Sequence, residues 1–306
     1  MTYFPVTNSN LSPAHLGRFV QEKYSLHKST TCKLIRAGIN DTYLVISNLE
    51  KYVFRVYSLN WRTKIEIEEE IRMLNELKEN RIPVSYAVVD RENNYLQKLN
   101  APEGDRFGVL FTYAEGEKLH RFPGEVHYQV GELMAQIHKV THNQSVNRVT
   151  YSPEVLLVDS LVQIKHFLNA DSEEMTFLRS TQQYLLNQLL GADVSQMRPG
   201  IVHLDIWFDN LNITSGKHIT LFDFDFCGNG WLALDIAYYI MQLHNVEKYD
   251  EKEYIPKVDS FLEGYESITT ISTEEKRLIP TLGVSLYYFY LGIQCRRYDN
   301  WSNSFL

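Results

Sequence analysis

The sequence predicts an α+β protein with a small β-rich N-terminal part and a larger, mostly helical C-terminal part. Between residues 31 and 114, runs of β-branched and aromatic residues alternate with turn residues, which is typical of an antiparallel sheet. One strongly periodic helix interrupts these runs at residues 64–80. Beyond residue 115, most segments carry apolar residues at helical spacing, apart from short apolar runs near residues 201–222.

Composition limits the class of protein and its partners. The 306 residues suffice for two hydrophobic cores, and 44% hydrophobic with 22% charged residues argues against disorder. The net charge of −8, without a basic run, argues against a nucleic-acid partner. The candidate membrane-spanning segments are too short or carry charges, and the first residues lack the basic segment and apolar core of a signal peptide. We therefore expect no membrane association. Cys32, Cys227 and Cys295 form neither a disulfide framework nor a zinc pattern, which favours the cytoplasm. The sequence indicates no oligomeric state.

The N-terminal part begins with a helix at residues 11–24, in which Ser12 is the N-cap and Pro13 takes the first helical position. The predicted strands are residues 31–37, 41–48, 51–58, 84–90, 94–99 and 106–114. The helix at residues 64–80 carries one apolar stripe of Ile67, Ile71, Leu74 and Leu77. These elements predict one antiparallel sheet with one long helix.

The C-terminal part predicts helices at residues 126–140, 178–190, 233–244, 261–269 and 272–298, with residues 141–165 irregular. Residues 233–244 are apolar nearly all round, so we expect them to be buried. Ser272 followed by Glu275 resembles a capping box at the start of the last helix. His138 is expected to be a packed structural histidine.

The chemistry centres on residues 201–235. Asn210 follows Asp205 by five positions, and Asp223 follows Asn210 by thirteen, at the end of a short apolar run. Protein kinases use this spacing for a catalytic Asp, a metal-binding Asn and a metal-binding Asp. We therefore predict that Asp205 takes the proton of an acceptor hydroxyl and that Asn210 and Asp223 hold Mg²⁺. Ordinary turn and cap chemistry would explain His203 and Asp205 alone, but not the whole pattern.

Residues 203–210, HLDIWFDN, resemble the HGDxxxxN motif of the aminoglycoside phosphotransferase and choline kinase superfamily. Residues 221–224, LFDF, resemble its IDF motif, and residues 235–237, DIA, resemble the DLA that follows. The resemblance runs along most of the chain and implies a bilobal protein-kinase-like fold. It implies a nucleotide-binding N-terminal lobe, residues 1–114, and a helical C-terminal lobe, residues 115–306, that carries the catalytic and metal-binding loops.

The resemblance also implies nucleotide contacts in the N-terminal lobe. Gly38, Ile39 and Asn40 lie where the family has its nucleotide-covering loop, although the segment is poor in glycine. Residues 110–116, LFTYAEG, resemble the hinge, which places the adenine contacts on the Thr112 carbonyl and the Ala114 N–H. A plain turn at Gly38 is the alternative.

A second implied contact is a phosphate anchor. Arg55 stands where protein kinases carry a Lys, and its planar fork suits phosphate. The family carries a helix with a Glu, a Leu four and seven positions later and a Pro thirteen positions later. Glu70, Leu74, Leu77 and Pro83 match this pattern, so Glu70 is the candidate partner of Arg55. The adjacent Glu68 and Glu69 stay open as partners of Arg55. The alternatives are a surface arginine and a solvated acidic helix face.

The implied function is transfer of the γ-phosphate of ATP, with Mg²⁺, to a hydroxyl of a small molecule. Homoserine, choline, an aminoglycoside and a sugar derivative all stay open as acceptors. Residues 56–61 also resemble stress-response protein Ser/Thr kinases of this fold. A non-catalytic nucleotide-binding scaffold and a hydrolase using the same metal pair are further alternatives. Asp225 is either a metal or substrate contact or a satisfied loop carboxylate. Asp235 is expected to cap its helix or brace the catalytic loop rather than to bind metal.

Overall fold

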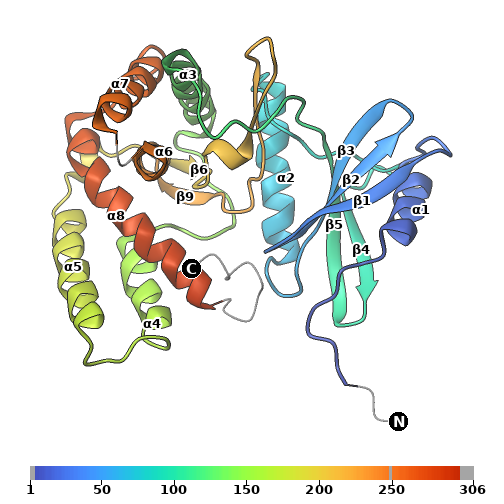
Figure 1. Cartoon of the computed structure of the whole chain (residues 1–306), viewed down its shortest axis with the longest axis horizontal. Coiled ribbons are helices and arrows are strands. Elements are labelled where there is room, and N and C mark those ends of the chain that lie inside the picture. Colours follow the sequence, from blue (N-terminus) through green and yellow to red (C-terminus); the bar gives the residue numbers. More distant parts are fainter. Residues whose placement is uncertain (1–3, 248–249, 297–306) are drawn as a thin grey trace. The chain divides into compact units, whose positions relative to one another are not determined.

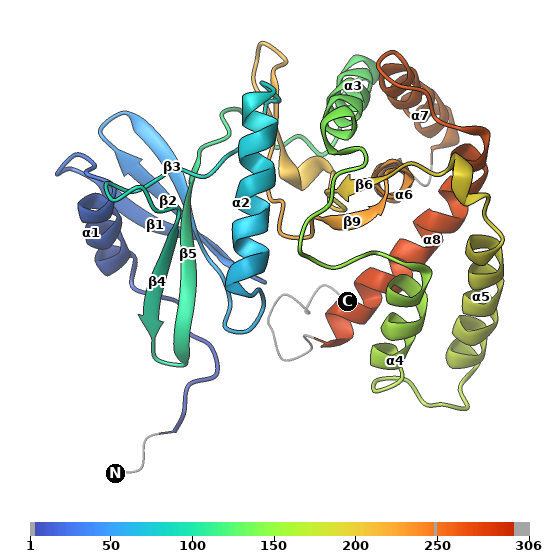
Figure 2. The same ribbon diagram turned by 180° about the vertical axis from the view of Figure 1, so that it is seen from behind.

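The computed structural model describes residues 4–247 and 250–296, which form two compact units (Figures 1 and 2). The N-terminal unit comprises residues 4–78 and 84–114, and the C-terminal unit comprises residues 79–83, 115–247 and 250–296. The architecture is α+β, as the sequence predicts, with a sheet in the first unit and mainly helices in the second.

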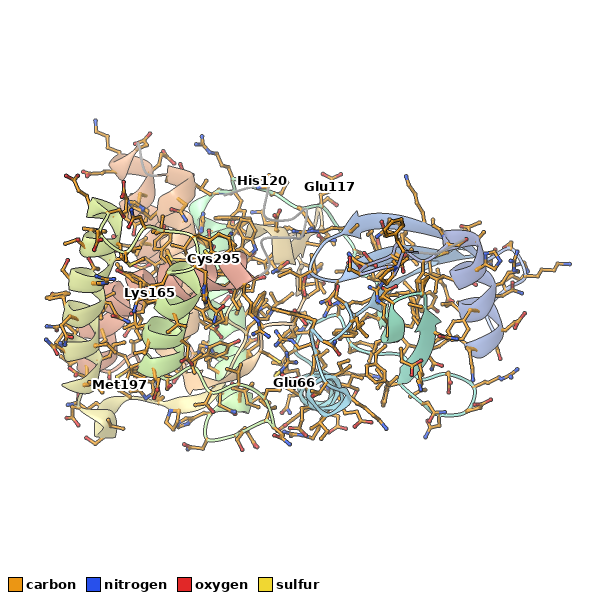
Figure 3. All side chains as sticks on the ribbon, turned by 90° about the horizontal axis from the view of Figure 1, so that it is seen from below. Glu66, Glu117, His120, Lys165, Met197 and Cys295 are labelled. Atoms are coloured by element: carbon orange, nitrogen blue, oxygen red, sulfur yellow. The ribbon has the colours of Figure 1, made fainter. Side chains whose placement is uncertain are left out.

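The N-terminal unit is a five-stranded antiparallel sheet in the order β1-β2-β3-β5-β4. Its elements are α1 (Pro13–Lys23), β1 (Thr31–Ala37), β2 (Asp41–Ser47), β3 (Glu50–Val56), α2 (Lys64–Glu79), β4 (Leu96–Ala101) and β5 (Gly104–Thr112). Thr63 and Glu66 cap α2 reciprocally, since each backbone N–H donates to the other's side chain; Glu66 is labelled in Figure 3. The cap sets where this helix begins.

The core of the N-terminal unit lies between α1 and the sheet. Leu16 and Val20 of α1 pack with Tyr43, Phe54 and Leu110 from three neighbouring strands. Alternate residues of β2 are buried, as period-two patterning requires of a strand covered on one face.

The predicted strand at residues 84–90 is wrong. This segment forms only isolated bridges, one at Val84 and one from Ala87 to Phe111, and Tyr86 donates its N–H to the Thr112 side chain. Val84 and Ala87 are nevertheless buried. Its β-favouring composition therefore reflects burial beside β5 and not a ladder of hydrogen bonds.

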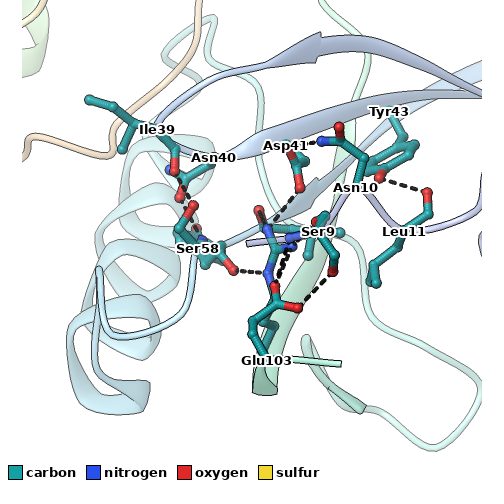
Figure 4. A network of polar contacts seen from close by, with 12 residues as sticks. Ser9, Asn10, Leu11, Ile39, Asn40, Asp41, Tyr43, Ser58 and Glu103 are labelled. Carbon is teal, nitrogen blue, oxygen red and sulfur yellow. Dashed lines mark hydrogen bonds and ion pairs between the residues drawn. The ribbon is translucent and has the colours of Figure 1, made fainter. Parts of the chain in front are cut away.

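A buried ionic cluster fixes the start of β2. The Arg106 guanidinium lies 2.8 Å from Asp41 and 3.3 Å from Glu103, and it also donates to the Tyr57 carbonyl at 2.8 Å. Figure 4 shows this network, with Ser9 bonded to Glu103. Because Asp41 directly follows Asn40, the cluster anchors one end of the predicted nucleotide-covering loop.

The C-terminal unit is mainly helical. Its helices are α3 (Gly124–Thr141), a π-helical turn (Glu154–Asp159) running into α4 (Ser160–Ile164), α5 (Glu173–Leu190), α6 (Ala233–Glu247), α7 (Glu251–Glu266) and α8 (Thr273–Arg296). The 3₁₀ turns are Val194–Gln196 and Phe208–Asn210. Its two short antiparallel pairs are β6 (Pro199–Val202) with β9 (Gly228–Trp231), and β7 (Leu211–Ile213) with β8 (Ile219–Leu221).

Three helix predictions need correction. Residues 154–164 are helical, whereas the prediction is irregular structure. The prediction fails because the π-helical turn departs from the 3.6-residue period on which it rests. Helix α5 begins at Glu173, after its N-cap Ser172, and not at residue 178. Helix α7 begins ten residues before the predicted start, with Pro256 inside it.

The predicted capping box of α8 is confirmed, since the Ser272 N–H donates to Glu275 and the Glu275 N–H donates to the Ser272 hydroxyl, both at 3.0 Å. Among the described helices, α8 alone is long and apolar enough to cross a membrane by composition. Half of that apolar stretch is buried inside the protein, and the core helix of a globular unit meets the same criterion.

Candidate functional site

The predicted catalytic loop, residues 203–210, follows β6 and is braced by Asp235 of helix α6, as one of the predictions for Asp235 stated. The Asp235 carboxylate, fully buried, accepts the N–H of His203 at 2.9 Å and the N–H of Leu204 at 2.6 Å. Leu204 has φ +65°, a left-handed conformation that bulky residues rarely adopt. This pair of hydrogen bonds from His203 and Leu204 to Asp235, called the brace below, therefore holds a strained turn directly before Asp205.

His203 connects two loops. Its Nδ1 accepts the Asp205 N–H at 3.1 Å, so the ring proton sits on Nε2, which donates to the Phe222 carbonyl at 3.2 Å. Phe222 directly precedes Asp223. One imidazole ring thus connects the loop of Asp205 to the loop of Asp223.

The spacing of thirteen residues between Asn210 and Asp223 is that of a small hairpin. Asn210 precedes β7, residues 214–218 turn, and β8 returns to Phe222, whose N–H donates to the Asn210 carbonyl at 3.0 Å. Asp223 then takes a left-handed conformation, φ +66°. The open end of the hairpin therefore brings Asn210 and the Asp223 loop together.

Asn210 contacts Asp205 directly. Its Nδ2 donates to the Asp205 carboxylate at 2.7 Å and to the Asp205 carbonyl at 2.9 Å. This use of the amide nitrogen leaves its Oδ1 oxygen as the atom that can bind a cation. Asp205 and Asp223 are both half-buried, so they can reach a ligand from the surface of the unit.

These donors fit a magnesium ion that is bound together with phosphates. Asn210 and Asp223 offer an amide oxygen and a carboxylate, and Mg²⁺ typically takes one or two protein oxygens plus water and phosphate. Within the described ranges, no group of three or more His, Cys, Asp or Glu side chains could hold a metal by itself. The donor set therefore suits a nucleotide-bound Mg²⁺ better than a closed structural metal site.

Asp225 lies two residues beyond Asp223 and is only 3% exposed. The Arg148 side chain donates to its backbone carbonyl, and the Tyr151 hydroxyl donates to the next carbonyl, that of Phe226. These contacts fix the chain after the loop that is predicted to bind metal. The role of the Asp225 carboxylate stays a prediction with both alternatives open.

His138 has the structural role expected of it. Its Nε2 lies 3.1 Å from Asp235, and its Nδ1 lies 2.7 Å from the Tyr265 hydroxyl of α7. The contact with Asp235 has no local sequence signal, because Asp235 lies 97 positions from His138. The histidine connects α3 and α7 to the brace of the catalytic loop.

Two tyrosines at the catalytic loop were not predicted as site residues. The Tyr238 hydroxyl donates to the Asp205 carboxylate at 2.5 Å, and the Tyr290 hydroxyl donates to the Leu204 carbonyl at 2.6 Å. A usable signal existed, since Tyr238 follows Asp235 by three positions and so shares its face of α6. Tyr290 carried no such signal, because only the fold brings α8 to this loop.

In the N-terminal unit, the structure brings Arg55 and Glu70 together. The guanidinium lies 3.0 Å from the Glu70 carboxylate, whose other oxygen accepts the Tyr57 hydroxyl at 3.1 Å. Arg55 is 8% exposed and Glu70 is fully buried, and the Arg55 guanidinium lies 5.1 Å from the centre of the Phe111 ring. Burial strengthens the attraction between the two charges, and the ion pair orients the arginine side chain.

The predicted nucleotide loop is a three-residue turn between β1 and β2. Ser58 holds it, since the Ser58 N–H donates to the Asn40 side chain at 3.2 Å and the Ser58 hydroxyl donates to the Ile39 carbonyl (Figure 4). A Cβ on Gly38 would meet no atom nearer than 3.6 Å. The protein's own packing therefore does not require glycine at Gly38.

The predicted hinge follows β5. The Thr112 carbonyl accepts the Ser85 hydroxyl, and because a carbonyl oxygen has two lone pairs it can accept a second donor. The Thr112 N–H donates to the Tyr86 carbonyl. Ala114 is buried. The arrangement is compatible with an adenine contact at the Thr112 carbonyl, which stays a prediction.

Comparison with known proteins identifies the family. The model of the phosphotransferase enzyme family matches residues 31–269. An uncharacterized protein of Synechocystis sp. is 31% identical over 291 residues, covering 91% of this chain and 77% of that protein. A homoserine kinase of Methylobacillus glycogenes is 22% identical over 258 residues, covering 84% of this chain and 77% of that enzyme.

Solved structures share the fold. A microcompartment-associated aminopropanol kinase matches with a TM-score of 0.77 at 20% identity, covering 93% of this chain and 90% of that one. An amicoumacin kinase in complex with AMP-PNP, Ca²⁺ and Ami matches with a TM-score of 0.78 at 17% identity, covering 94% and 86%. The kinase-like fold predicted from the sequence is thereby confirmed. The chain belongs to the phosphotransferase enzyme family and is a kinase.

Proposed function

We propose that this kinase transfers the γ-phosphate of ATP to a hydroxyl of a small molecule and requires Mg²⁺. The observation that supports this best is the contact of Asn210 with Asp205, together with the His203 ring that connects the Asp205 loop to Asp223. These contacts support the proposal, because they connect the proposed proton acceptor with the two proposed metal ligands in the C-terminal unit. The amicoumacin kinase structure contains AMP-PNP and Ca²⁺, which is consistent with the same kind of ligand here.

In the proposed reaction, Asp205 accepts the proton of the acceptor hydroxyl as its oxygen bonds to the γ-phosphorus. The bond between that phosphorus and the bridging oxygen of ADP breaks in line with the attack. Asn210 and Asp223 hold Mg²⁺, which supplies charge neutralisation on the phosphates. Arg55, oriented by Glu70, binds phosphate oxygens, and Thr112 and Ala114 contact adenine through backbone groups.

We propose a small amino alcohol or antibiotic as acceptor, because the named relatives and structural neighbours act on homoserine, aminopropanol and amicoumacin. A small-molecule acceptor is preferred to a protein one, since all of these are small molecules. The family match and the catalytic geometry also disfavour the non-catalytic scaffold.

Thermal unfolding with MgATP, with ATP plus chelator, and with Mg²⁺ alone tests the ligand requirement. A ligand that binds only the native state at 100 times its Kd stabilises it by about 2.7 kcal/mol. We expect a clear rise in Tm only when ATP and Mg²⁺ are both present. An equal rise with ATP plus chelator would contradict the metal requirement, and no rise at millimolar MgATP would contradict nucleotide binding.

A further inference from the structure

Both oxygens of the Asp205 carboxylate are held by donors from different elements. Tyr238 of α6 donates to Oδ1 at 2.5 Å, and Asn210 donates to Oδ2 at 2.7 Å. Tyr238 is 3% exposed, so its ring is fixed by packing and its hydroxyl has a defined position. Two donors from opposite ends of the carboxylate leave its side-chain torsions little freedom.

A second tyrosine supports the same turn. Tyr290 of α8 lies with its ring centre 5.3 Å from that of Tyr238, and its hydroxyl donates to the Leu204 carbonyl at 2.6 Å. Leu204 is the residue in the strained left-handed conformation, and its N–H is held by Asp235. Helices α6 and α8 therefore fix both the backbone before Asp205 and the carboxylate itself.

Tyr238 is built to donate a proton in a hydrogen bond and not to lose it. Burial, and then the negative charge of Asp205, raise the pKa of Tyr238 well above its ordinary value. The hydroxyl therefore stays protonated throughout the working pH range. Each carboxylate oxygen has further lone pairs, so Asp205 can still accept a proton while Tyr238 is bound.

We propose that Tyr238 is a positioning residue for phosphoryl transfer, which holds the Asp205 carboxylate in the rotamer that receives the acceptor's proton. The inference rests on the proposed function, because it assigns Tyr238 a role through the proton acceptor of that reaction. A reacting group that is fixed before the reaction needs no reorganisation in the transition state, which raises kcat and not substrate affinity.

Tyr238→Phe tests this role, because it removes the hydroxyl and keeps the ring. We expect kcat to fall about 10- to 100-fold, while the KM values for ATP and for the acceptor change less than about threefold. The assay follows phosphate transfer from MgATP to L-homoserine, 1-amino-2-propanol, choline and kanamycin, and to water. An unchanged kcat, or a loss confined to the acceptor KM, would overturn the proposal.

Tyr239→Phe is the matched control. The neighbouring Tyr239 is fully buried and its hydroxyl pairs with His127 at 2.8 Å, away from Asp205. We expect this variant to lower Tm and to keep kcat. If Tyr238→Phe proves too unstable to assay, Tyr238→3-fluorotyrosine keeps ring and donor, and retention of kcat within about threefold is expected.

A double-mutant cycle with Asp205→Asn distinguishes positioning from a separate contribution. If Tyr238 acts through Asp205, adding Tyr238→Phe to Asp205→Asn lowers the residual rate no further. A full additional loss would show that Tyr238 acts elsewhere and would overturn the proposal. Absence of MgATP turnover by the unaltered chain, with water as with all four alcohols, would instead contradict the proposed function itself.

Discussion

The carboxylate of Asp235 holds the backbone N–H of Leu204 at 2.6 Å, and Leu204 is one of two non-glycine residues at the site with positive φ. Asp235 also accepts the His203 N–H and contacts His138, and all of these groups are buried. A buried carboxylate is stable only when it is paired in this way. The brace and the catalytic turn therefore depend on one another.

Asp235→Asn should destabilise the C-terminal unit. The amide cannot offer two acceptor oxygens to the His203 and Leu204 N–H groups, and we expect a loss of about 3 kcal/mol of unfolding free energy. Urea unfolding measures it. The control Asp159→Asn, an exposed residue, should change the unfolding free energy by less than about 0.5 kcal/mol. Equal stability of the two variants would contradict the assigned brace.

Glu70→Gln should weaken both the fold and nucleotide binding. It leaves the Arg55 guanidinium without its buried counter-charge, and we expect about 3 kcal/mol of destabilisation together with a higher KM for ATP. Glu69→Gln is the control, because Glu69 pairs on the helix surface with Arg72. A normal KM for ATP in a folded Glu70→Gln protein would argue against Arg55 as the phosphate anchor.

Two glycines should respond differently to alanine. Gly116 has φ +107°, and a Cβ there would lie 2.5 Å from the backbone carbon of Ile213, so we expect Gly116→Ala to cost about 3 kcal/mol or more of stability. Gly38→Ala meets no such contact and should stay within about 1 kcal/mol. The Kd for MgATP, measured by calorimetry, then reports on the loop: a loss in Gly38→Ala, without a stability change, indicates close approach of phosphate. Unchanged affinity would remove Gly38 from the nucleotide site.

Stability should fall in acid partly through His127. Burial, aided by the positive charge of Lys257, lowers the pKa of His127 to about 4. The unfolded state takes up its proton near pH 6.5, whereas the folded state resists until about pH 4, so the stabilisation present above pH 6.5 is lost as the pH falls through this window.

The pH dependence is checked by comparing variants. Between pH 7.5 and pH 4, the unaltered protein should lose about 3 kcal/mol more unfolding free energy than His127→Gln does. The exposed His218→Gln serves as control and should follow the unaltered protein. Parallel curves for all three proteins would show that His127 is not the buried neutral group described here.

Local patterns predicted most of the fold, and their failures have physical causes. The reciprocal Ser272–Glu275 cap depends only on neighbouring residues, so sequence reasoning could find it. The sequence wrongly predicts a strand at residues 84–90 because burial and strand pairing favour the same residue types. The sequence does not predict the helical turn at residues 154–159, because a π-turn lacks the 3.6-residue period of an α-helix.

At the candidate site too, features set by local sequence could be predicted, and features set by tertiary packing could not. Asp205, Asn210 and Asp223 were predicted from spacing, because a fixed loop and a fixed hairpin separate them in the chain. Glu70 was selected among three adjacent glutamates by pattern, and its burial beside Arg55 agrees with that choice. Tyr290 could not be found, since 86 positions separate it from Leu204 and only tertiary packing joins them.

The most direct test of the account is phosphate transfer by Asp205→Asn, measured beside the binding of MgATP. Asp209→Asn, the same substitution in the same loop, is the control, because Asp209 has no part in the proposed chemistry. We expect Asp205→Asn to bind MgATP normally and to lose kcat by about 100-fold or more, while Asp209→Asn transfers phosphate normally. Full turnover by Asp205→Asn would contradict the account, since no proton acceptor would then be needed at Asp205.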